Sequence, residues 1–124
     1  MPDYDSSRFS PPAPVAQVTL RNPDSGVARA GVVMLLDTGA DVTLLPRAAA
    51  DELGLSYSAD GYELTGFDDR ARVAHAVRAE MVFLGLTFRG RFLIIEQDWG
   101  IIGRNILNSI SLTYNGPKLS WERS

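Results

Sequence analysis

Residues 32–41 run Val32-Val33-Met34-Leu35-Leu36-Asp37-Thr38-Gly39-Ala40-Asp41, an apolar segment that leads directly into a carboxylate, a hydroxyl and a glycine. The continuous aliphatic run predicts a strand that is buried on both faces. A strand of this kind holds Asp37 in one place, and Gly39 lets the backbone turn and a ligand approach closely. The pattern therefore predicts a catalytic site formed by Asp37, Thr38 and Gly39.

A single carboxyl group cannot both activate a water molecule and protonate a leaving group. Two facing carboxyl groups can share one proton and divide these tasks. The other Asp-hydroxyl-Gly sequence that we considered, Asp24-Ser25-Gly26, follows Arg21-Asn22-Pro23 rather than an apolar strand, so it predicts a hairpin turn. The second carboxyl group is then expected to come from Asp37 of a second copy, across a two-fold axis.

The length of the chain supports this expectation. It has 124 residues, of which 45% are hydrophobic, and a single compact domain usually holds ~100–150 residues. A chain of this size can bury one core but has little room for two matched lobes. A site that needs two lobes must therefore recruit a second chain.

Composition excludes several other kinds of chemistry. The chain has 12 Lys and Arg against 15 Asp and Glu, with no basic stripe, so we expect no nucleic-acid partner. It has no Cys, which excludes thiol catalysis and thiolate metal sites. Its single histidine, His75, is not enough for a nitrogen-rich metal site. The chain also has no Gly-x-Ser-x-Gly sequence, which a serine hydrolase would need. We expect no metal and no cofactor.

The start of the chain, Met1-Pro2-Asp3-Tyr4-Asp5, is acidic and unlike the basic start of a secretory signal. The longest apolar runs are far too short to span a bilayer. We therefore expect a cytoplasmic protein with no signal peptide, no transmembrane segment and no membrane partner.

Residues 1–14 are rich in Pro and Ser and predict a flexible, extended tail without strand pairing, followed by one folded domain over residues 15–124. Helices are expected over Pro46–Gly54, with proline at the first helical position and glycine at the end, and over Arg104–Ile110. Alternating or apolar patterns predict strands, and a terminal hairpin, at Val15–Leu20, Ala28–Leu36, Tyr62–Thr65, Thr87–Glu96, Leu112–Tyr114 and Lys118–Trp121.

The segment from Arg70 to Leu84 fits two structures. As a helix it would begin at Asp68 or Asp69, and its alanines mildly favour this reading. As a strand it would place alternate apolar residues on one face. We predict a strand, for a topological reason that depends on the second motif.

That second motif is Ile101-Ile102-Gly103-Arg104-Asn105, in which apolar residues precede a glycine and a short helix. Together with Leu-Leu-Asp-Thr-Gly at 35–39, and in this order, it resembles the retropepsin family, the homodimeric aspartic proteases of retroviruses and their cellular and bacterial relatives. The resemblance covers about Val15 to Trp121. It implies a mostly β, single-domain acid-protease barrel with a flap hairpin and two short helices.

The resemblance also implies a function. The chain would be an aspartic endopeptidase that hydrolyses peptide bonds as a homodimer, with water activated between two Asp37 carboxyl groups. Substrate would contact Gly39, Asp41 and the flap tip at Gly66, Phe67 and Asp68. A flap hairpin requires a strand after its tip, which is why we predict a strand for the segment after Asp69.

The remaining roles implied by the resemblance are structural. Thr38 would hydrogen-bond across the dimer axis, and Arg104 would pair with Asp41 and brace the catalytic loop. Gly103 and Asn105 would support the short helix. The alternative function is a catalytically silent module of the same fold that dimerises or binds peptides, although the intact Asp-Thr-Gly sequence argues against it.

Overall fold

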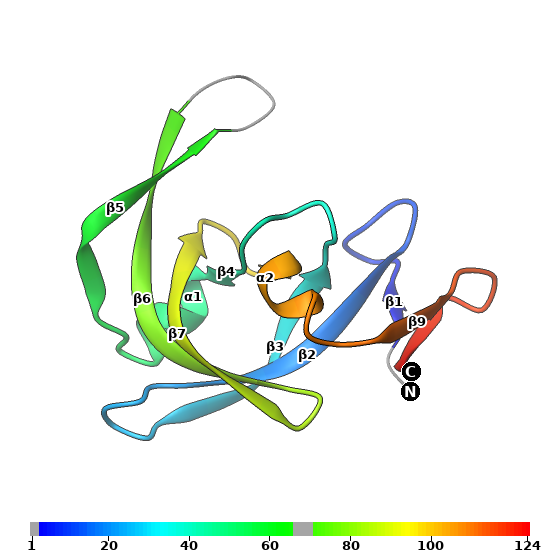
Figure 1. Cartoon of the computed structure of the whole chain (residues 1–124), viewed down its shortest axis with the longest axis horizontal. Helices are drawn as coiled ribbons and strands as arrows, with labels where there is room; N and C mark the ends of the chain where they lie inside the picture. The colour runs from blue at the N-terminus through cyan, green and yellow to red at the C-terminus, as the bar shows by residue number, and fades with distance from the viewer. Residues whose placement is uncertain (1–2, 66–70) are drawn as a thin grey trace.

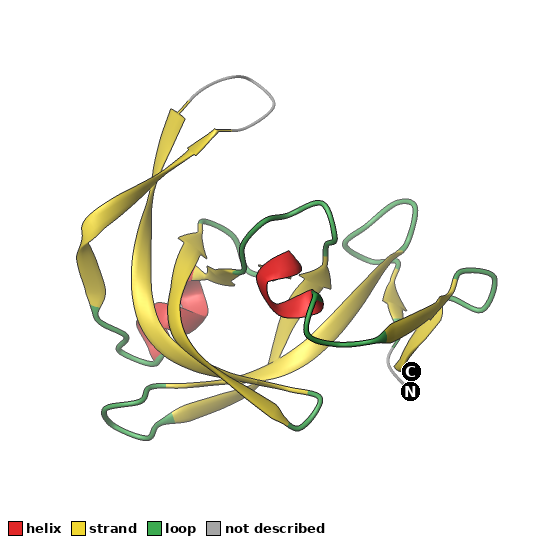
Figure 2. Cartoon of the chain, in the orientation of Figure 1, coloured by secondary structure: helices red, strands yellow, loops and turns green. Residues whose placement is uncertain are grey.

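The computed structural model describes residues 3–65 and 71–124, with side chains described outside residues 58–74. In the part of the chain that the structure describes, strands dominate and two short helices accompany them, as the sequence predicts (Figures 1 and 2). The elements in chain order are β1 (Tyr4–Asp5), β2 (Ala13–Arg21), β3 (Ala28–Leu36), β4 (Leu44–Pro46), α1 (Arg47–Glu52), β5 (Tyr57–Thr65), β6 (Ala71–Phe83), β7 (Leu86–Ile95), β8 (Gly100–Ile102), α2 (Arg104–Leu107), β9 (Leu112–Asn115) and β10 (Ser120–Arg123).

Six of these strands close into a barrel. Hydrogen-bonded neighbours follow the order β2-β3-β8-β4-β7-β6, and pairing of β2 with β6 closes the ring. Outside the ring, β1 lies beside β2 and β5 lies beside β6, whereas β9 and β10 form a separate two-stranded sheet. Figure 1 shows the β5–β6 hairpin rising away from the barrel.

The turn between β2 and β3 contains the Asp24-Ser25-Gly26 sequence. The side-chain oxygen of Asn22 accepts hydrogen bonds from the backbone N–H groups of Asp24 at 2.9 Å and Ser25 at 3.3 Å. An asparagine that binds its own backbone in this way stabilises a turn. The prediction that this sequence is a hairpin turn is confirmed.

The core lies inside the barrel and receives alternate side chains from the ring strands. On β3, Val32, Met34 and Leu36 are buried, whereas Val33 and Leu35 are only half-buried. The prediction that residues 32–36 are buried on both faces is therefore wrong. A strand in a barrel wall has one inward face and one outward face, and the outward face of β3 leads to Asp37.

The ambiguous segment from Arg70 to Leu84 contains strand β6, so the prediction of a strand is confirmed there. β6 pairs with β5 and β7 and also with β2. This pairing outweighs the helix propensity of the alanines, because backbone hydrogen bonds are then made on both edges of the segment. Alternate residues Val77, Ala79, Met81 and Phe83 are buried in the core.

Several boundaries differ from those predicted. α1 is shorter than Pro46–Gly54: Pro46 lies at the N-cap rather than at the first helical position, and the chain turns at Gly54, whose φ is +64°. α2 ends at Leu107 rather than Ile110. β5 begins five residues before the predicted Tyr62, and the three-residue strands β4 and β8 were not predicted.

The segment predicted to be an unpaired tail makes strand contacts. Tyr4 and Asp5 pair with Pro14 and Ala13 on β2, and Asp3 bridges to Ser120 of β10. The prediction of no strand pairing is wrong here, because the prolines lie in the loop between the paired residues or at the edge of the ladder, where a missing N–H is tolerated.

Candidate active site

Asp37 leaves the end of β3, where the strand lies parallel to β8. Leu36 is in register with Ile102, and the backbone N–H of Asp37 donates to the Ile102 carbonyl at 3.1 Å. The Asp37 carboxylate accepts the N–H of Gly39 at 2.9 Å, and the N–H of Ala40 donates to the Asp37 carbonyl at 3.2 Å. These bonds hold the carboxyl group in a tight loop in which it stays half-buried.

Gly39 is placed where a larger residue would crowd the carboxylate. A Cβ atom at this position would lie 3.1 Å from the Oδ1 atom of Asp37. The hydrogen bond from the Gly39 N–H and the lack of a side chain thus act together. They leave the Asp37 carboxyl group oriented by the backbone and open to a ligand on its exposed side.

Arg104 joins the two motifs. Its guanidinium donates to the Thr38 carbonyl at 2.8 Å and forms an ion pair with the carboxylate of Asp41. Its backbone N–H donates to the Ala40 carbonyl at 2.8 Å. A planar guanidinium suits such simultaneous contacts, so one side chain braces the loop on both sides of Gly39. The structure thus contains the Arg104–Asp41 contact that the resemblance implies.

Gly103 lets the second motif pack against the first. It is buried, and a Cβ atom at this position would lie 2.3 Å from the carbonyl oxygen of Val42. Real Cβ atoms do not approach backbone that closely, so the 40–43 segment and the start of α2 meet here only because residue 103 is glycine.

Thr43 is a site residue that the sequence reasoning missed. Its side chain is 1% exposed. Its hydroxyl accepts the N–H of Gly103 at 3.1 Å and donates to the side-chain oxygen of Asn105 at 2.8 Å. A hydroxyl residue inside the apolar run Val42-Thr43-Leu44-Leu45 was the available signal, since a buried polar side chain needs a hydrogen-bond partner.

The other predicted site residues are distributed as follows. Thr38 and Asp41 are exposed, and Asn105, also exposed, accepts the hydrogen bond from the Thr43 hydroxyl. Gly66, Phe67 and Asp68 lie outside the described residues. The strands that lead to them, β5 and β6, are described, and in Figure 1 they rise on the same side of the barrel as the loop between β3 and β4.

Apolar side chains lie on and next to the two strands that support Asp37. Leu35 and Ile101 are in register on β3 and β8, and both are half-buried on the outward face. Trp99 directly precedes β8 and packs edge-to-face against Phe9, with 4.9 Å between ring centroids. Neither aromatic residue was predicted to belong to the site, because nothing local in the sequence connects Phe9 with Trp99.

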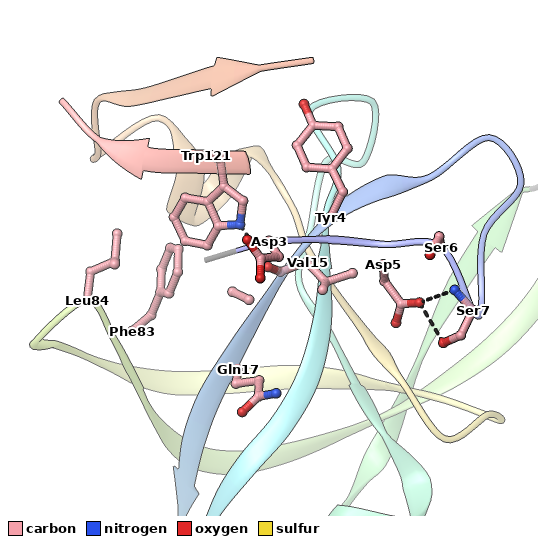
Figure 3. A pocket seen from close by; sticks show the side chains of 11 residues that line it. Asp3, Tyr4, Asp5, Ser6, Ser7, Val15, Gln17, Phe83, Leu84 and Trp121 are labelled. Atoms are coloured by element: carbon pink, nitrogen blue, oxygen red, sulfur yellow. Dashed lines mark hydrogen bonds between the residues drawn. The ribbon is translucent and has the colours of Figure 1, made fainter. Parts of the chain in front are cut away.

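A separate pocket of about 620 Å³ lies between β1, β10 and the turn between β6 and β7 (Figure 3). Trp121, Phe83, Leu84 and Val15 supply its apolar surface, and Asp3 and Gln17 are among its polar residues. None of its lining residues belongs to the Asp37 site. Among the described side chains, those of residues 3–57 and 75–124, no group of three or more His, Asp or Glu could hold a metal ion. No helix within residues 3–65 and 71–124 is long and apolar enough to cross a membrane.

Comparison with known proteins agrees with the geometry. The model of the family described as aspartyl protease matches residues 17–106, which include both motifs, so the chain belongs to this family. The fold is similar to that of EIAV protease, solved in complex with the inhibitor HBY-793. The TM-score is 0.57 at 22% identity, over 78% of this chain and 86% of that chain. The comparison with curated proteins found no match. The predicted resemblance to retropepsins and the predicted fold class are confirmed.

Proposed function

We propose that this chain is an aspartic endopeptidase that works as a homodimer, with Asp37 of each subunit at the catalytic centre. The observation that carries the proposal is the Asp37 loop. The Gly39 N–H orients the carboxylate, the backbone N–H of Asp37 is bonded to Ile102, and the Arg104 guanidinium donates to the Thr38 carbonyl. So much local support for one half-buried carboxylate fits a group that must be held still for catalysis.

In this proposal one Asp37 is ionised and the other holds the shared proton. The ionised carboxylate takes a proton from water as the water oxygen bonds to the peptide carbonyl carbon, and the protonated carboxyl group gives its proton to the carbonyl oxygen. The tetrahedral intermediate then collapses and the C–N bond breaks: the leaving nitrogen receives a proton from the carboxyl group that gained one, and the other carboxylate takes a proton from a hydroxyl of the intermediate. This gives the carboxylic acid product and restores the shared proton. No metal or covalent intermediate is needed.

The requirement for two carboxyl groups is the argument for a dimer. One six-stranded barrel supplies one Asp37 loop, so a second copy must supply the other. Thr38 is exposed beside Asp37 and could hydrogen-bond its counterpart across the axis. In the described part of the chain β9 pairs only with β10, so its other edge is open to a strand from the second subunit.

The substrate would be an extended peptide. The β5–β6 hairpin would act as the flap and pair with the peptide backbone in strand fashion. Leu35, Ile101 and Trp99 would favour apolar side chains next to the cleaved bond, because burying such side chains against them is favourable. Asp41 and Gly39 would contact the peptide at the loop.

The test is digestion of a peptide library by the wild-type protein and by Asp37→Asn, with products identified by mass spectrometry. Asp24→Asn is a matched control, because Asp24 belongs to an Asp-hydroxyl-Gly sequence in an exposed turn. We expect cleavage by wild type and by Asp24→Asn, inhibition by a pepstatin-type compound, and no cleavage by Asp37→Asn, which should still fold and dimerise. Cleavage by Asp37→Asn at the wild-type rate would refute the proposal. A wild-type dimer that binds peptides without cutting them would favour the silent module.

A further inference from the structure

The root of the β5–β6 hairpin carries a cluster of polar side chains that the catalytic loop does not use. We call Arg47, Asp51, Tyr57 and Glu96 the root cluster. The Tyr57 hydroxyl donates to the Asp51 carboxylate and accepts from the Arg47 guanidinium at 3.2 Å. Arg47 also donates to Glu96 at 2.5 Å, and its guanidinium carbon lies 5.2 Å from the centre of the Tyr57 ring.

The four residues come from three separate parts of the fold. Arg47 and Asp51 lie on α1, Tyr57 is the first residue of β5, and Glu96 follows the last residue of β7. His75 of β6 packs edge-on against the Tyr57 ring, with 6.2 Å between ring centroids. The cluster therefore connects both strands of the hairpin with the barrel.

This connection matters because β5 has little other support. In the described part of the chain β5 lies at the end of the strand order and pairs only with β6. Its register with β6 shifts between Tyr57 and Gly61, so regular pairing is interrupted next to the root. A strand held on one edge, with an interrupted ladder at its base, depends on side-chain contacts for its orientation.

The same cluster reaches the connection before β8, the strand that supports the catalytic loop. Glu96 begins the connection from β7 to β8, which continues through Trp99. β8 then supplies the Ile102 carbonyl that accepts the N–H of Asp37. The hairpin root and the support of Asp37 thus share one short piece of chain.

We propose that the root cluster positions the β5–β6 hairpin for substrate binding, and that Tyr57 is its central positioning residue. The inference rests on the proposed function, because it assigns the hairpin a role toward a peptide bound at Asp37. Tyr57 touches neither substrate nor the reacting atoms in this scheme. Its hydroxyl fixes the angle at which the hairpin leaves the barrel.

The variant that tests this is Tyr57→Phe, which keeps the ring on Arg47 and His75 and removes only the hydroxyl. We expect KM to rise by about two- to tenfold, the range that one or two hydrogen bonds represent. We expect kcat to stay within about twofold, because a pure loss of binding leaves the chemical step unchanged. Tyr4→Phe is the matched control, since Tyr4 lies on β1 beside the separate pocket and outside the root cluster.

A second measurement does not depend on activity. Amide hydrogen exchange over residues 57–65 should be faster in Tyr57→Phe than in wild type and unchanged in Tyr4→Phe. Asp51→Ala, which removes the acceptor of the Tyr57 hydroxyl, should reproduce the effect, and adding it to Tyr57→Phe should change KM little further, because both remove the same contact. This variant also serves if Tyr57→Phe does not fold.

An unchanged KM in Tyr57→Phe overturns the proposal, even with faster exchange, because the hairpin would then need no fixed root to bind substrate. Unchanged exchange in β5 overturns it as well. If wild type has no Asp37-dependent turnover, the proposed function fails separately. The dissociation constant of a pepstatin-type inhibitor, measured by calorimetry, then replaces KM, and an equal value for wild type and Tyr57→Phe overturns the positioning role.

Discussion

The hydroxyl of Thr43 accepts the backbone N–H of Gly103 at 3.1 Å, and this bond ties the chain after the Asp37 loop to the start of α2. Both residues are buried. The same hydroxyl donates to Asn105, so one side chain satisfies two polar groups of the second motif. Because water cannot replace these bonds at a buried position, the loss of the hydroxyl should be costly.

Thr43→Val keeps the shape of the side chain and removes both bonds. We expect the free energy of unfolding to fall by about 1–3 kcal/mol, the cost of leaving a buried polar group without its partner. Urea denaturation followed by circular dichroism measures this directly. Thr87→Val, at an exposed position of β7, is the control and should change stability by less than about 0.5 kcal/mol. Equal effects of the two substitutions would contradict the role given to Thr43.

Gly103→Ala should disrupt the site by steric overlap. The added Cβ atom would lie 2.3 Å from the carbonyl oxygen of Val42, and that backbone cannot move without displacing the catalytic loop. We expect a loss of about 3 kcal/mol of stability, at the upper end for an overpacked core, together with loss of peptide cleavage. Gly116→Ala is the control, because a Cβ atom there meets nothing within 4 Å. A Gly103→Ala protein with wild-type melting temperature and activity would show that the two motifs do not pack as described.

The residues of the site differ in how well the sequence could predict them. Asp37 was found because it follows an apolar strand in a short motif, whereas the role of Arg104 was predicted only from the resemblance to retropepsins. Thr43 was missed because its partner Asn105 lies far away in the sequence. Tyr57 was missed because its partners Arg47 and Asp51 are brought to it only by the path of the chain between α1 and β5. Local patterns carry no information about such pairs.

The same limit explains the errors in the fold. β6 was predicted correctly only because the family topology overruled its alanine content. β4 and β8, each of three residues, are too short to show a hydrophobic period, and they are strands only because β3, β7 and each other provide edges. The pairing of Tyr4–Asp5 with β2 likewise depends on a chain reversal through prolines, which a local reading takes as a tail.

Arg104→Lys should reduce activity more than stability. Lysine keeps the charge near Asp41, but it cannot donate to Asp41 and to the Thr38 carbonyl with the same fixed geometry. The Arg104 and Asp41 side chains are 43% and 82% exposed, so the ion pair itself contributes at most about 1 kcal/mol. We expect kcat/KM to fall by about tenfold, since loosening of a catalytic loop is costly for the reaction. Arg29→Lys is the control, because Arg29 forms an exposed ion pair with Glu52, and it should leave kcat/KM unchanged. A fall of about tenfold in kcat/KM for Arg29→Lys as well would show that the effect is not specific to Arg104.

Asp5 should make the N-terminal loop sensitive to acid. The backbone N–H and the guanidinium of Arg8, followed by the hydroxyl and N–H of Ser7, hold the pKa of the Asp5 carboxyl well below its usual range. A carboxyl group with a lowered pKa stabilises the folded state above its unfolded pKa, about 3.9. This contribution is lost as the pH falls from there through the folded pKa.

The difference in melting temperature between wild type and Asp5→Asn should therefore be largest above about pH 5 and shrink progressively below about pH 4. Thermal melts in a pH series measure it. Asp24→Asn, which removes only a 3.7 Å exposed ion pair with Arg78, should show a much smaller difference at every pH. A difference for Asp5→Asn that stays constant down to about pH 2 would mean that the carboxylate is not held by this loop.

In the proposed peptidase, Trp99 should influence which substrate side chains are accepted beside the cleaved bond. It stands immediately before β8, two residues from Ile101 on the half-buried face that leads to Asp37, and Phe9 packs against its ring. Trp99→Val removes much of this wall and frees space for a larger substrate side chain. We expect kcat/KM for peptides with an aromatic residue beside the cleaved bond to rise by about tenfold relative to peptides with a small aliphatic residue there. Trp99→Phe keeps an aromatic ring and should leave this ratio of kcat/KM values near that of wild type. Phe9→Ala removes the ring that packs against Trp99. It should shift the ratio in the same direction as Trp99→Val, but less. Competition between the two peptide classes in one reaction measures the ratio directly, and a ratio that is the same in all four proteins would place Trp99 outside the substrate-binding surface.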